Sequence, residues 1–109
     1  MDYKKLNEIK QLMGEDFHKL VAIYISDNKK RLDELDEKIH KCDYLEIKQI
    51  AHSMKSSSAN IGADQASSIA ANIEQYAISE SIANILVLLP QLKIAIAEVF
   101  QILNNEQNH

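Results

Sequence analysis

Only three of the 109 residues are glycine or proline, and this scarcity limits the chain to folds with few turns. A β-sandwich or β-barrel needs many tight turns, so these architectures are excluded. Apolar residues make up 46% of the chain and recur mostly at spacings of three and four, the period of an amphipathic α-helix. The fold class is therefore predicted to be all-α.

Helical periodicity and end signals divide the chain into one short helix and four longer ones. The short helix covers residues 1–13 at most, ends near Gly14 and is expected to cap one end of a bundle. The four longer helices are predicted at Glu15–Lys41, Tyr44–Ile61, Asp64–Ala77 and Ser81–Leu103. Because the connections are short, we expect a single domain over residues 1–109, an antiparallel four-helix bundle.

Several positions carry more detailed expectations. Asp43 and Asp64 are predicted to cap the N-termini of the helices that follow them. Asn28 lies on an apolar stripe, so it should find a buried partner or mark a gap in the packing. Pro90 should kink the last helix or break it in two, because proline removes a backbone hydrogen bond. Residues 104–109 have no apolar anchor and are expected to fray.

Charge and cysteine content narrow the class of partner. The net charge of −4 argues against nucleic acid, which would require a dominant basic surface. Cys42 is the single cysteine, which excludes an internal disulfide and fits a reducing cytoplasm. No signal peptide opens the chain, and the longest apolar run, Ile85–Leu89, is too short to span a bilayer. We therefore expect a cytoplasmic protein that binds no membrane. Although the sequence does not determine the oligomeric state, a monomer is the expectation.

One stretch, Ala51–Ala63, differs from the ordinary amphipathic pattern. At 100° per residue, His52 lies about 140° from the centre of its helix's apolar stripe and should point to solvent. Two lysines and two small residues share this side, which leaves room for another protein and would stabilise an added anion such as a phosphoryl group. The residues of the predicted site and docking surface are Lys48, Gln49, His52, Lys55, Ser56 and Ala59. On geometry alone, a solvated surface histidine remains the alternative.

Glu74 is the predicted partner of the histidine. If the chain turns around Gly62 and Ala63, residues whose numbers average to 63 lie level on facing helices, and His52 and Glu74 satisfy this condition. A carboxylate that accepts a hydrogen bond from Nδ1–H would fix the imidazole tautomer and leave Nε2 free as a nucleophile. An ordinary glutamate at the edge of the apolar stripe is the alternative.

The run from Ala51 to Ala63, followed by Glu74, resembles the histidine-containing phosphotransfer (HPt) domains of multistep phosphorelays. These domains typically show Ala-His-x-Leu-Lys-Gly-Ser-Ser, with Gly-Ala a few residues on. This chain has Met54 in place of the leucine and Ser56 in place of the glycine. The resemblance extends over essentially the whole helical pattern.

The resemblance implies that His52 accepts a phosphoryl group from a receiver-domain aspartate and passes it to another receiver. It also implies that Lys55 stabilises the phosphorylated state and that Glu74 bonds the histidine. The expected partners are receiver domains of response regulators or hybrid sensor kinases. On this basis the protein is a phosphocarrier without kinase activity of its own, and Mg²⁺ belongs to the receiver.

Two other interpretations stay open, and a metal site is disfavoured. The bundle could be an interaction module that binds a receiver or partner helix without phosphorylation. It could also be a phosphotransfer domain cut from a larger sensor kinase, although a start at Met1 favours a free-standing protein. Two Glu-x-x-His pairs contain His18 and His40, but on one helix these residues lie about 33 Å apart and cannot share a metal. No metal or cofactor is therefore expected.

Overall fold

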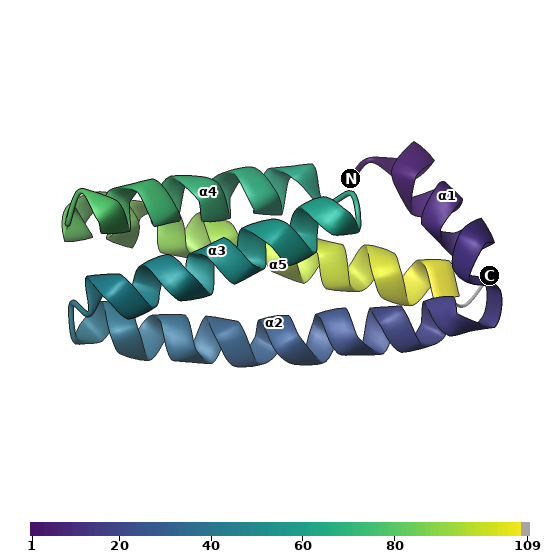
Figure 1. The fold of residues 1–109 in the computed structure, drawn as a ribbon, viewed down its shortest axis with the longest axis horizontal. Helices are drawn as coiled ribbons and strands as arrows, with labels where there is room; N and C mark the ends of the chain where they lie inside the picture. Colours follow the sequence, from purple (N-terminus) through teal and green to yellow (C-terminus); the bar gives the residue numbers. More distant parts are fainter. Residues whose placement is uncertain (108–109) are drawn as a thin grey trace.

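One short helix and four long antiparallel helices make up the computed structural model, which describes residues 1–107 (Figure 1). The helices are α1 (Tyr3–Met13), α2 (Phe17–His40), α3 (Tyr44–Asn60), α4 (Asp64–Ile78) and α5 (Ile82–Gln107), and a 3₁₀ turn at Gly14–Asp16 precedes α2. Within residues 1–107 there is no β-strand. The predicted all-α class and four-helix bundle are confirmed.

The start of one predicted helix and the N-cap of another differ from the structure. The second helix begins at Phe17 instead of Glu15, because Gly14 adopts a φ of 55° and the chain passes through the 3₁₀ turn first. Asp43 caps α3 as predicted, since its carboxylate accepts a hydrogen bond from the Glu46 N–H. At α4, Ala63 occupies the N-cap and Asp64 is already helical, so the predicted cap at Asp64 is wrong. The Asp64 carboxylate still lies where the helix dipole favours negative charge.

The last helix, α5, is longer and less interrupted than its sequence suggested. It continues through Pro90, so a break into two helices is wrong. Pro90 is exposed, and water can therefore satisfy the carbonyl that loses its donor. The predicted fraying is also wrong for residues 104–107, because Lys10 Nζ holds the Glu106 main-chain oxygen at 2.8 Å and its carboxylate at 3.2 Å. Residues 108–109 lie outside the described part of the chain.

The two helices that carry the predicted site, α3 and α4, pack more closely than any other pair. Their buried positions include many small side chains, which let two helix backbones approach each other. These buried small residues are Ala51, Ser58, Ala66, Ala70 and Ala77. A side chain that leaves one of these helices can therefore reach the other.

A buried polar network joins α2 to α3. Asn28 is fully buried, and its side-chain amide donates to the Tyr24 carbonyl at 2.9 Å and to the Ser57 hydroxyl at 3.3 Å. The Tyr24 hydroxyl lies 2.8 Å from the hydroxyl of Ser58. The prediction that Asn28 finds a buried partner is confirmed. Because each member has a partner, the network fixes how α2 sits against α3 without leaving a polar group unsatisfied.

The short helix α1 lies across the end of the bundle at the α3–α4 turn, as predicted (Figure 1). The Asp2 N–H donates to the Gly62 carbonyl at 2.8 Å, and Lys5 Nζ donates to the Ala59 carbonyl at 2.8 Å. Gly62 has a φ of 83°, and a Cβ at this position would lie 2.9 Å from the Asp2 carbonyl oxygen. The turn therefore needs glycine both for its conformation and for the close approach of α1.

Leu6 is the only buried residue of α1, and the half-buried Ile9 and Met13 pack against the core beside it. We expect Leu6→Ala to lower the free energy of unfolding by about 2–4 kcal/mol, as other large-to-small core substitutions do. Leu12→Ala is the matched control, since Leu12 is 87% exposed and should change this free energy by less than about 0.5 kcal/mol. Urea unfolding followed by circular dichroism measures both. Equal effects would show that α1 is not anchored by Leu6.

Candidate functional site

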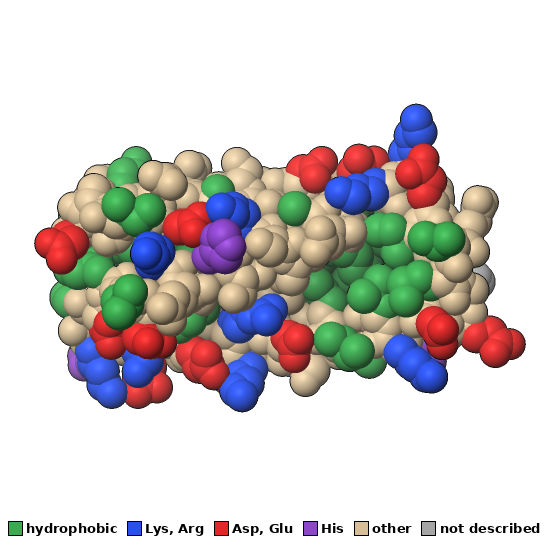
Figure 2. Space-filling model, viewed as in Figure 1, with side chains coloured by type: hydrophobic (Ala, Val, Ile, Leu, Met, Phe, Trp, Pro, Cys, Tyr) green, Lys and Arg blue, Asp and Glu red, His purple; other side chains and the backbone are tan. Residues whose placement is uncertain are grey.

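The candidate site is built on the outer face of α3. The inner face of this helix is held in the core by its apolar stripe, Ile47, Ile50, Ala51, Met54 and Ser58. His52 falls between these positions, and its side chain is 59% exposed. Figure 2 shows a histidine on this face of the bundle with lysine and acidic side chains around it. The predicted exposure of the imidazole is confirmed.

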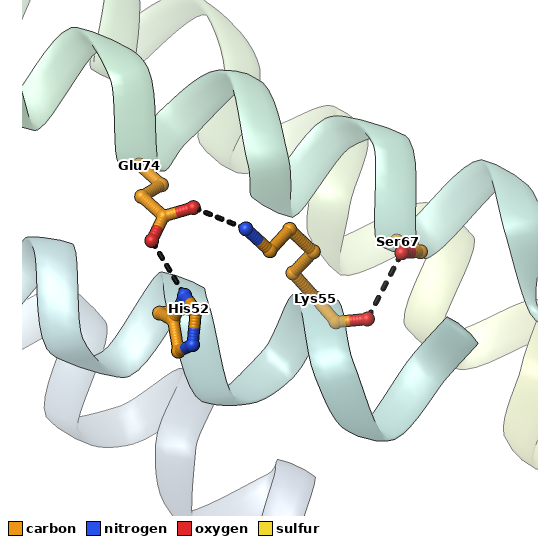
Figure 3. A network of polar contacts seen from close by, with 4 residues as sticks. All are labelled: His52, Lys55, Ser67 and Glu74. Carbon is orange, nitrogen blue, oxygen red and sulfur yellow. Dashed lines mark hydrogen bonds and ion pairs between the residues drawn. The ribbon is translucent and has the colours of Figure 1, made fainter. Parts of the chain in front are cut away.

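Glu74 reaches the imidazole from α4. The His52 Nδ1 atom lies 2.7 Å from Glu74 Oε2, and the other ring nitrogen points away from the carboxylate (Figure 3). An ionised carboxylate can only accept, so Nδ1–H is the donor, and in the neutral ring the lone pair is then on Nε2. The structure thus brings together the two residues that the hairpin geometry paired.

Lys55 binds the same carboxylate from the other side. Its Nζ lies 2.6 Å from Glu74 Oε1, while the Ser67 hydroxyl donates to the Lys55 carbonyl at 2.9 Å (Figure 3). The Lys55 side chain is 33% exposed, so this ion pair is only partly screened by water. Glu74 therefore holds His52 with one oxygen and Lys55 with the other.

The surroundings of Glu74 keep it ionised. The hydrogen bond from Lys55 is the largest influence, and with the His52 bond and the positive charges it lowers the pKa of Glu74 below its ordinary value of 4.5. Burial of the carboxylate acts in the opposite direction but is outweighed. The acceptor that fixes the His52 tautomer is thus charged at neutral pH.

The residues of the predicted docking surface do not all lie at the same place. A shallow open hollow beside the imidazole is lined by Lys48, Gln49, His52, Ser53 and Glu74. Ser56 is exposed and Ala59 half-buried, and both lie further along α3, outside this hollow. An apolar hollow between α2 and α3 follows in that direction, where Figure 2 shows a hydrophobic patch. Its lining residues include Leu20, Ile23, Tyr24 and Ile61.

Two residues of the site were missed by the sequence argument. Ser53 lines the hollow beside His52, and its position directly after the histidine in the sequence could have identified it. Ser67 could not be found by pairing residues that average to 63, because it meets the Lys55 carbonyl at a different height. Within residues 1–107 no three histidine, cysteine or acidic side chains are grouped to hold a metal, and this includes His18 and His40.

Comparison with known proteins identifies the family. The family model for the Hpt domain matches residues 19–102. The chain belongs to the Hpt domain family. The sensor protein TorS of Escherichia coli (strain K12) is 36% identical over 80 residues, which cover 72% of this chain but only 9% of TorS. As an Hpt domain, the chain takes part in histidine phosphotransfer within a phosphorelay.

A solved structure supports the same fold. The crystal structure of histidine-containing phosphotransfer protein B (HptB) from Pseudomonas aeruginosa PAO1 matches with a TM-score of 0.95 over 100% of this chain and 96% of that one. The two sequences are 23% identical. The helical arrangement is therefore retained although most side chains differ.

The lowered pKa of Glu74 predicts how stability depends on pH. A carboxyl group with a depressed folded-state pKa stabilises the fold above its unfolded-state value, and this contribution is lost as the pH falls through the folded-state value. Glu74→Gln should therefore be less stable than wild type by about 1–2 kcal/mol at pH 7, and the gap should close as the pH falls below the ordinary value of 4.5.

Urea unfolding at a series of pH values measures this gap. The control is Glu8→Gln, which changes the same chemical group at an exposed position of α1 and should stay within about 0.5 kcal/mol of wild type throughout. A gap between Glu74→Gln and wild type that does not change with pH would contradict the assignment.

Proposed function

We propose that His52 is the residue of this Hpt domain that carries the phosphoryl group, taking it from one receiver aspartate and giving it to another. The observation that supports this most is the 2.7 Å contact between His52 Nδ1 and Glu74, with Nε2 directed to solvent. A single tautomer with an exposed Nε2 lone pair is the form of imidazole that acts as a nucleophile.

The transfer step follows from this geometry. Nε2 attacks the phosphorus of a receiver aspartyl phosphate in line, the new N–P bond forms, and the P–O bond to the aspartate breaks. The electron pair of that bond leaves with the carboxylate of the receiver. The ring becomes positively charged, and the Glu74 carboxylate at Nδ1–H stabilises that charge. Mg²⁺ is held by the acidic residues of the receiver, and passing the group on is the same step in reverse.

The two lysines have different parts in this proposal. Lys55 is bound to Glu74 and neutralises the carboxylate, which would otherwise repel an incoming phosphoryl group. Lys48 lines the hollow beside the imidazole and is the cation that meets the phosphoryl oxygens. The family resemblance assigns stabilisation of the phosphorylated state to Lys55, and here that effect is indirect.

The receiver docks on the surface around His52. Lys48, Gln49, Ser56 and Ala59 form its centre, and the apolar hollow between α2 and α3 lies at its edge. The Ser56 hydroxymethyl group affects the rate and the choice of receiver.

All groups of the site come from one chain, so a single copy suffices for transfer. The protein acts in the cytoplasm as a phosphocarrier, without kinase activity, metal or cofactor of its own, and binds neither nucleic acid nor membrane.

Label transfer tests the site directly. Receiver domains encoded in the same genome are labelled with radioactive acetyl phosphate and Mg²⁺ and then mixed with the protein. We expect wild type to take up label that is acid-labile and alkali-stable, as a phosphohistidine is, and His52→Gln to take up none. If no receiver labels wild type, the bundle is an interaction module and the carrier function is wrong. Label on His52→Gln would move the site elsewhere.

The assignment of Lys48 predicts a salt-dependent effect on rate. Lys48→Ala should slow transfer from the same receiver about tenfold, which corresponds to about 1.4 kcal/mol of transition-state stabilisation. The loss should shrink at high ionic strength, because salt screens the charge of a half-buried lysine that lines an open hollow. Lys4→Ala, which removes the same charge from the exposed surface of α1, is the matched control. Equal rates for the two variants would remove Lys48 from the site.

A further inference from the structure

The outer face of α5 carries large apolar side chains that no other helix covers. One side of this helix is in the core, while on the other side Val87 and Ile94 are each 62% exposed and Leu86 is 53% exposed. By length and composition alone the helix could cross a membrane, although the sequence showed only short apolar runs. Exposed apolar side chains that gather on one face of a helix can mark a surface that binds a partner. Within residues 1–107 nothing covers Val87 and Ile94.

The exposed residues on this face follow a heptad spacing. We define the outer seam of α5 as six exposed residues separated alternately by four and three positions: Ala83, Val87, Pro90, Ile94, Ala97 and Gln101. The inner face of the same helix has the same alternation, through Ile85, Leu89, Leu92, Ile96, Val99 and Leu103. The outer seam therefore repeats the pattern with which α5 packs against the helices of its own bundle.

Charges on the two flanks of the outer seam match in one orientation. Lys93 directly precedes Ile94, and Glu98 directly follows Ala97, so they occupy the g and e positions of this heptad. In a parallel helix pair, a g residue faces the e residue five positions later in the partner, which joins Lys93 to the partner's Glu98 twice by symmetry. In an antiparallel pair, g meets g and the two charges do not face each other.

We propose that the protein forms a weak parallel homodimer through the outer seam of α5. The seam is about 27 Å long at the helical rise, but its alanines bury little area, so the dimer is weaker than one with a standard interface. Lys93 also binds Asp36 of its own chain at 2.9 Å, and its ammonium group has further donors for the partner's Glu98. This proposal differs from the monomer expected from sequence.

The dimer leaves the phosphotransfer site free. Helices α3 and α5 make no backbone contact, and Figure 1 shows α5 behind α3, on the side of the bundle away from the face with His52. Both copies can therefore bind receivers at the same time. The proposal concerns a surface that phosphotransfer does not use, so it stands or falls independently of the proposed function.

Sedimentation velocity at low salt tests the association. From about 10 μM to about 1 mM, the weight-average mass should rise from 12.4 kDa toward twice that value. Val87→Glu combined with Ile94→Glu should remain at monomer mass with unchanged circular dichroism, because both side chains are exposed. Leu12→Glu, an exposed apolar residue off the seam, is the control and should associate as wild type does.

Charge exchange tests the orientation. Lys93→Glu and Glu98→Lys should each weaken association roughly fivefold, because like charges then face each other across the seam. A mixture of the two variants should recover it, since each chain supplies the charge that the other needs. The proposal is overturned if wild type stays a monomer at about 1 mM or if the mixture associates no better than either variant alone. If wild type floats with phosphatidylcholine–phosphatidylglycerol vesicles and the double glutamate variant does not, the outer seam binds lipid and the proposal is overturned.

Discussion

The close approach of α3 and α4 is the constraint on which the site depends. Small buried residues line both helices, and Gly62 lets the chain turn sharply between them. Only at this separation can one glutamate side chain from α4 contact two residues of α3. Glu74 is 8% exposed, and removing an ionised carboxylate from water costs free energy unless it is hydrogen-bonded. The bonds to His52 and Lys55 offset this cost, so the network that orients the imidazole also stabilises the helix pair.

The electrostatics of this network would suit the phosphoryl transfer that we propose for His52. A free carboxylate beside the ring would orient it but would also repel a phosphoryl group. Lys55 cancels most of that charge without taking the hydrogen bond that His52 needs, because it uses the other carboxylate oxygen. Ser67 holds the Lys55 backbone to α4 and keeps the lysine at this position. Glu74 thus sets the orientation of the imidazole, while Lys55 sets the net charge beside it.

Sequence reasoning located most of the fold and the central pair of the site. Helical periodicity is strong where an apolar stripe must be buried. In a tight helical hairpin, residues equally far from the turn in sequence lie side by side, which is why His52 and Glu74 could be paired. The bond from Lys55 to Glu74 was not predicted, because the averaging rule gives each residue one level partner, whereas Lys55 lies three residues after His52 and reaches the same carboxylate. The predicted break at Pro90 and the predicted fraying after Leu103 were wrong because both depend on the surroundings of the residues in the fold. Whether a proline breaks a helix depends on whether it faces solvent, and whether an end frays depends on contacts such as that of Lys10 with Glu106.

Helix α5 shows where composition and structure give different information. An apolar run is usually explained by the core, yet a helix at the corner of a four-helix bundle can bury only part of its circumference. The inner alternation of α5 is enough to account for its packing, and the exposed Val87 and Ile94 lie outside it. Because α5 is diagonal to α3, a surface that binds a second copy can persist there without covering the face that receivers need. The proposed receiver contact and the proposed dimer contact therefore lie on different sides of the bundle.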